Sequence, residues 1–132
     1  MFMETIEHDF REKVCSKLSL INEGIDRFLV STPFHFDDGD HLIIILKKEN
    51  GDWILSDEGH TYMHLTYSID TESLLSGLNQ KAIAKVLSSF NIEEWDGELK
   101  LTIKDKRYGD ALYNYIQALL KLSDVNFYHT NT

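Results

Sequence analysis

The fold is decided by residues 41–61, HLIIILKKENGDWILSDEGHT, which contain an unbroken aliphatic run from Leu42 to Leu46. A short apolar run bounded by turn-forming residues predicts a strand that is covered on both faces. Asn50-Gly51 follows this run, and Asn-Gly favours a hairpin because both central residues of a type I′ turn need positive φ. Trp53–Leu55 is therefore predicted to be the returning strand, which ends at Ser56–Gly59.

The remaining elements are read from the period of the apolar residues. Phe10, Val14, Leu18 and Ile21 form one stripe, which predicts an N-terminal amphipathic helix that ends at Gly24. The other predicted elements are strands over 27–34, 41–48 and 52–56, broken helices over 60–90, a strand at 98–104 after the Asp96-Gly97 turn, and a helix over 108–122. Asp70 or Thr71 is the expected cap of one of the middle helices.

This order of elements predicts an α+β fold in a single domain that spans residues 1–132. Short links between the first three strands make them an antiparallel meander, to which one or two further strands are added. The N- and C-terminal helices are expected to pack on this sheet. Near the end of the chain, Val125, Phe127 and Tyr128 are expected to fold back onto the core.

The net charge of the chain limits the kinds of molecule that it can bind. The 22 acidic and 13 basic residues give a formal net charge of −9, which argues against direct binding to nucleic acid or to an anionic membrane. The longest apolar run has five residues, and the charged N-terminus is unlike a signal peptide. The single cysteine, Cys15, allows no intrachain disulfide and no thiolate metal cage, so we expect a cytoplasmic protein without a cofactor.

Several motifs resemble a known family. They are the segment 31–34 (STPF), Asp40 before the apolar strand, the segment 54–61 (ILSDEGHT) and the hairpin 96–99 (DGEL). Together they are similar to the family called domain of unknown function 1828, from which this chain departs by carrying His60. The resemblance implies a bacterial or mobile-element origin and brings no established chemistry with it.

Ser56–Thr61 is the strongest candidate site, because it lies where a strand ends and loops commonly carry function. A purely structural role suits the same residues. Asp57 would accept hydrogen bonds from turn N–H groups, Gly59 would adopt positive φ, and His60 or Thr61 would begin a helix.

Two groups of residues have side chains that could bind a metal ion, and both have simpler explanations. His60 and His64 have the i, i+4 spacing of helical metal ligands, but the sequence identifies no third ligand. Asp37, Asp38 and Asp40 are hard-cation donors in a loop that lacks the frame of a calcium loop. Exposed histidines and a solvated turn are the favoured readings, so no metal is expected.

Two functions follow from these observations. The first is a non-enzymatic acidic binding protein that occupies a basic site on a partner protein, as a phage or mobile-element inhibitor would when it mimics nucleic acid to block a defence nuclease. A homodimer remains open. The binding residues would be Asp37, Asp38, Asp40, Asp57, Glu58, His60, Thr61, Glu93, Glu94, Asp96 and Glu98. The alternative is a small metal-dependent nuclease or hydrolase that uses Asp57, Glu98 and Lys100.

Overall fold

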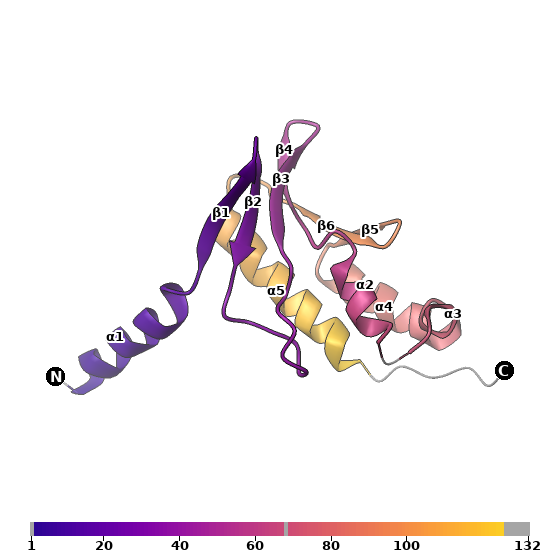
Figure 1. Ribbon diagram of the computed structural model, residues 1–132, viewed down its shortest axis with the longest axis horizontal. Helices are drawn as coiled ribbons and strands as arrows, with labels where there is room; N and C mark the ends of the chain where they lie inside the picture. The colour runs from indigo at the N-terminus through magenta and orange to yellow at the C-terminus, as the bar shows by residue number, and fades with distance from the viewer. Residues whose placement is uncertain (1, 68, 126–132) are drawn as a thin grey trace.

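The structure is a computed structural model that describes residues 2–67 and 69–125, so Phe127 and Tyr128 lie outside the described residues. Six antiparallel strands form one sheet in the order β1-β2-β3-β4-β6-β5 (Figure 1). The elements are α1 (Phe2–Cys15), β1 (Ser19–Gly24), β2 (Arg27–Ser31), β3 (Ile45–Glu49), β4 (Asp52–Ser56), α2 (His60–Leu65), α3 (Thr71–Leu74), α4 (Gly77–Ser89), β5 (Glu93–Trp95), β6 (Glu98–Thr102) and α5 (Tyr108–Asp124). The predicted α+β class is confirmed.

The predicted central hairpin is present. Asn50 and Gly51 have φ of 53° and 85°, as a type I′ turn requires, and they join β3 to β4. The ladder begins later than predicted, at Ile45. Residues 42–44 run beside β2 with a backbone bond of 2.9 Å from Val30 N to Ile44 O. Ile44 is fully buried, so the aliphatic run is the centre of the core.

Helix α5 covers one face of the sheet. Its apolar side chains Leu119 and Leu122 are fully buried, and Tyr115 donates a hydrogen bond of 2.6 Å from its hydroxyl to the Leu99 carbonyl oxygen on β6. α4 packs beside α5 and adds Ile83, Val86 and Leu87 to the same core. Val125 packs at the edge of this core.

The broken helices over 60–90 are confirmed as α2, α3 and α4. The predicted cap is Asp70, whose carboxylate accepts a hydrogen bond of 2.9 Å from Ser73 N. No helix within the two described ranges is long and apolar enough to cross a membrane.

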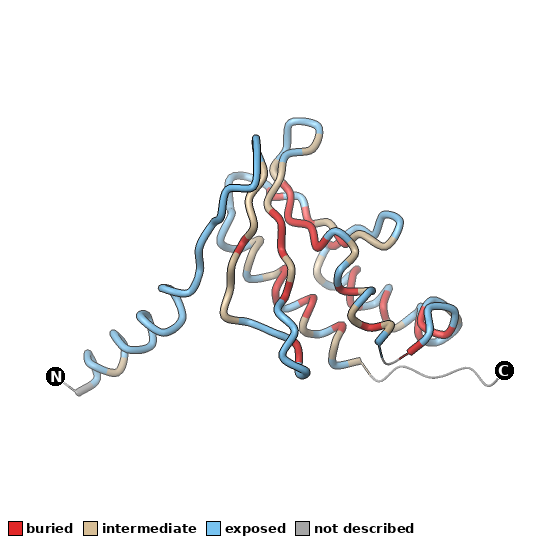
Figure 2. Tube along the Cα trace, viewed as in Figure 1, coloured by how far each residue is buried: buried red, intermediate tan, exposed pale blue. Residues whose placement is uncertain are grey.

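The predicted N-terminal helix is too long. α1 ends at Cys15, and Leu18–Gly24, assigned to the helix, instead contribute the edge strand β1. The reason is pairing with β2, where Leu20 lies opposite Val30 and Ile21 opposite Leu29, because tertiary pairing overrides a local helical period. α1 extends away from the sheet, and every described side chain on it except half-buried Ile6 is exposed (Figure 2).

Candidate functional site

Asp57 is an organiser of the turn after β4. Its carboxylate is fully buried and accepts hydrogen bonds from three backbone N–H groups, those of Gly59 (3.0 Å), Thr61 (3.1 Å) and Leu99 (3.0 Å). Gly59 has φ of 85°, and α2 begins at His60. These contacts are the structural role that the sequence allowed for this segment. Since Asp57 and Thr61 are buried, they cannot form part of a contact surface, contrary to their place among the predicted binding residues.

A charged network lies on the sheet face opposite α5, at the end of β4. Glu58 accepts two hydrogen bonds from the Arg27 guanidinium, at 2.7 and 2.8 Å, and a third from Lys47 Nζ at 3.2 Å. Lys47 Nζ also lies 2.9 Å from Glu98 Oε2, which accepts a hydrogen bond from the buried Ser56 hydroxyl. Strands β2, β3 and β6 are thus joined by side chains as well as by their backbones.

The network shifts the pKa values of its members. The Arg27 guanidinium lowers the pKa of Glu58 to about 2, with a further contribution from Lys47. Partial burial would raise the pKa of Glu98, but the Ser56 hydroxyl and Lys47 outweigh it and lower that pKa. Glu58 and Glu98 are therefore ionised and internally neutralised at pH 7, so they add little to an acidic surface that attracts a partner.

Glu98 and Lys100 of the nuclease alternative form an ion pair at 3.8 Å, but all three residues of that alternative are held by other partners. The oxygens of Asp57 face backbone N–H groups, Glu98 is held by Ser56 and Lys47, and Lys100 Nζ binds Glu49 at 3.0 Å. A metal-dependent hydrolase needs carboxylate oxygens that share one open coordination position. Nothing in this arrangement favours that activity.

The loop before β3 gathers the other predicted acids around His64. His64 Nδ1 lies 3.2 Å from Asp40 and 3.6 Å from Asp38, and its ring stacks on Phe36 at a centroid distance of 4.0 Å. Within the described ranges, Asp38, Asp40 and His64 are the set whose donor atoms all lie within 4.8 Å of one another. His60 lines the adjacent hollow of about 250 Å³ but does not join this set, and Asp37 is exposed. The Asp38 and Asp40 side chains are half exposed, whereas that of His64 is 15% exposed, so the cluster lies at the surface of the loop.

The β5–β6 hairpin displays an exposed tryptophan among acids. Trp95 is 72% exposed, and it borders a hollow of about 370 Å³ on the sheet face that also carries the charged network. Ile54 contributes apolar surface to this hollow, and Glu49, Asp52 and Glu93 surround it, so we call it the acidic groove. Asp52 and Glu93 form no ion pair with any described residue, whereas Lys100 in the groove is engaged by Glu49. The groove is therefore a negative, partly apolar surface.

The other acids of this hairpin differ from one another. Asp96 is exposed in the turn with φ of 53°, and Glu94 is exposed and hydrogen-bonded to the Tyr62 side chain. The sequence predicted Glu93, Glu94 and Asp96 to be binding residues, but it did not point to Trp95 or Asp52. An aromatic residue between acids in a hairpin was the available signal for Trp95. Asp52 could be identified as a groove residue only from the strand register, which places it across the sheet from β5.

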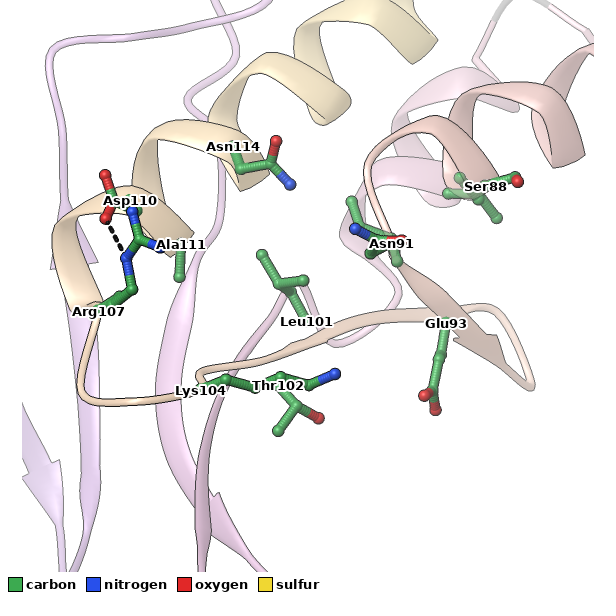
Figure 3. Close-up of a pocket in the computed structure, with 12 residues that line it drawn as sticks. Ser88, Asn91, Glu93, Leu101, Thr102, Lys104, Arg107, Asp110, Ala111 and Asn114 are labelled. Atoms are coloured by element: carbon green, nitrogen blue, oxygen red, sulfur yellow. Dashed lines mark hydrogen bonds and ion pairs between the residues drawn. The ribbon is translucent and has the colours of Figure 1, made fainter.

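A larger hollow of about 820 Å³ lies between the end of α4, the β5–β6 hairpin and the start of α5 (Figure 3). Three of its polar side chains are engaged with the protein itself. Arg107 binds Asp110 at 2.8 Å, and Asn114 donates a hydrogen bond of 2.8 Å to the Phe90 carbonyl oxygen. Leu101 lies in the middle of the view, so apolar surface forms the centre of the hollow.

The motifs around β4 and the β5–β6 hairpin belong to a recognisable domain. The model of a family described as "Domain of unknown function DUF1828" matches residues 32–122. The chain belongs to the DUF1828 family. The match includes the Asp57 turn and the acidic groove, whereas α1, β1 and β2 precede it. No curated protein and no solved structure matches this DUF1828 chain.

Proposed function

We propose that this DUF1828 protein is a non-enzymatic binding protein that uses the acidic groove to hold a basic surface of a partner protein. The observation that carries the proposal is Trp95, 72% exposed beside a groove bordered by Asp52 and Glu93. Tryptophan is enriched among the few residues that anchor protein interfaces and supply most of the binding energy.

The charges set the chemistry of the partner. Asp52 and Glu93 form no ion pair with the part of the chain that the structure describes, so their charge is available to Lys or Arg side chains of another protein. Ile54 and Trp95 provide apolar surface for the aliphatic stems of the same side chains. A partner with a lysine- or arginine-rich groove, such as a nucleic-acid-binding enzyme, fits this description. Inhibition of a defence nuclease by a mobile-element protein that mimics nucleic acid is the specific form of the proposal.

The proposal is tested by comparing three baits in extracts of the native host. The first is the wild-type chain, and the second is the groove variant Trp95→Ala, Asp52→Asn, Glu93→Gln. The third is a matched control, Tyr113→Ala, Asp37→Asn, Asp38→Asn, which also loses two negative charges and one exposed aromatic residue, since Tyr113 is 71% exposed on α5. Proteins retained on each bait are quantified by mass spectrometry.

We expect a basic protein that the wild type and the control retain and the groove variant loses. Once purified, that protein should bind the wild-type chain directly. The nucleic acid that the partner recognises should compete with the wild-type chain for this binding. Identical sets of proteins on all three baits contradict the use of the groove. Binding without competition by nucleic acid retains the binding function and removes the mimicry.

A further inference from the structure

The sheet face that α5 covers is left open at one end. Between β1–β2 and the first turns of α5 lies an apolar groove of about 540 Å³, lined by Leu20, Phe28, Leu46, Trp53, Tyr108 and Leu112, among others. Protein interiors leave few voids larger than a water molecule, so a hollow of this size and apolar lining is a vacant contact surface and not a packing defect. It lies on the opposite face of the sheet from the acidic groove.

The same chain carries a helix that has no surface to cover. Met3, Phe10 and Val14, spaced for one side of α1, are 72%, 66% and 46% exposed, and Ile6 lies between them on the same side. A lone amphipathic helix of 14 residues is only marginally stable in water, because helices in proteins depend on packing of their apolar side. The exposed apolar side of α1 therefore has to pack against another apolar surface for the helix to be stable.

The connection to β1 directs α1 away from its own groove. The helical hydrogen bonds continue past Cys15, from Lys17 N to Val14 O at 3.3 Å and from Leu18 N to Cys15 O at 3.1 Å. The Ser16 hydroxyl also binds the Glu12 carbonyl oxygen. These bonds link the end of α1 to the connection that leads into β1, and Figure 1 shows α1 extending away from the sheet.

We propose that two copies of the chain exchange their N-terminal helices, so that α1 of each copy lies in the apolar groove of the other. A two-fold dimer requires that one chain carry both halves of the contact, and this chain does. The charges agree, because residues 3–15 hold four acids and two bases, whereas Lys48 lies at the end of the groove with Nζ 5.4 Å from the Trp53 ring. Residues of the edge strand β1, all exposed in the single chain, join the helix to the groove.

Exchange is tested first by the mass of the purified full chain in light scattering and sedimentation. We expect twice the 15.3 kDa of one chain. Phe10→Glu on α1 and Leu20→Glu in the groove should each raise the dimer dissociation constant at least about tenfold, as loss of an apolar anchor does. Both residues are exposed in the single chain, so folding should persist, which circular dichroism checks.

Each variant has a matched control. Thr5→Glu adds the same charge to the opposite side of α1, and Ile21→Glu adds it to β1 on the face away from the groove, where Ile21 is 49% exposed against 56% for Leu20. Both controls should remain dimeric. A monomeric wild type, a dimeric Leu20→Glu variant, or equal loss of the dimer in Ile21→Glu would overturn the exchange.

A second measurement separates exchange from a helix that folds back on its own chain. Cys15 is the single cysteine, and it is exposed at the end of α1. Donor-labelled and acceptor-labelled chains should show energy transfer after mixing, and the Phe10→Glu chains should not. Absence of transfer in the mixed wild-type chains would overturn the proposal.

Discussion

The carboxylate of Asp57 and the backbone N–H of Leu99 are joined by a hydrogen bond of 3.0 Å between the residue that follows β4 and the start of β6. The same carboxylate holds Gly59 and Thr61, so one buried side chain fixes the turn, the start of α2 and the neighbouring strand. Ser56, Glu58 and the acidic hairpin all depend on this anchor for their positions.

Asp57→Asn should destabilise the protein by about 2–3 kcal/mol, because an amide leaves one buried N–H facing an NH₂ group in place of an acceptor. Urea unfolding followed by fluorescence measures the change. Asp52→Asn is the control, since it alters an exposed aspartate without an ion pair to a described residue. Equal midpoints for Asp57→Asn and wild type would refute the anchoring role.

Glu58 should make stability depend on pH in acid. Its folded pKa of about 2 lies below the ordinary glutamate value of 4.5, so the contribution is present above pH 4.5 and is lost as pH falls toward 2. Glu58→Gln should lower stability at pH 7 by on the order of 1 kcal/mol, since the partly exposed network is screened by solvent. Between pH 4.5 and 2 the stability of the Glu58→Gln variant should fall less steeply than that of the wild type. A Glu58→Gln slope equal to that of the wild type would contradict the assignment.

Gly59 should be replaceable only at the cost of backbone strain. Its φ is 85°, and a Cβ at this position would meet only the Gly97 carbonyl oxygen, at 3.9 Å, which is an ordinary contact. The cost of Gly59→Ala is therefore expected to come from the backbone alone, about 1 kcal/mol, with a larger cost for β-branched Gly59→Val. Gly59→Asn should cost less than Gly59→Ala, because Asn tolerates positive φ. Equal stability of all three variants in thermal unfolding would contradict this reading.

The parts of the fold that could be predicted are those with a local cause. The hairpin at Asn50-Gly51 follows from the turn residues, and the buried position of Ile44 follows from the aliphatic run. The strand β1 was missed because Leu18 and Ile21 fit a helical stripe, and because the hairpin turn at Ile25-Asp26 that pairs β1 with β2 lacks an Asn-Gly or Asp-Gly signal. The charge of the exposed surface could not be predicted either, since the sequence does not show that Glu58 and Glu98 are neutralised by Arg27 and Lys47.

Binding at the acidic groove should divide into two kinetic effects. Asp52→Asn with Glu93→Gln removes rim charges, so it should slow association with a basic partner and flatten the salt dependence of the association rate. Trp95→Ala removes the proposed anchor, so it should speed dissociation by about tenfold or more and change association little. Surface-plasmon measurements at several ionic strengths, with the partner identified by the three-bait comparison, give both rates.

Asp37→Asn with Asp38→Asn is the charge control, because those residues lie on the loop beside His64 and not in the acidic groove. If the control slows association as much as the groove variant does, the acids act only through net charge. An unchanged dissociation rate in Trp95→Ala would place the anchor elsewhere on the chain.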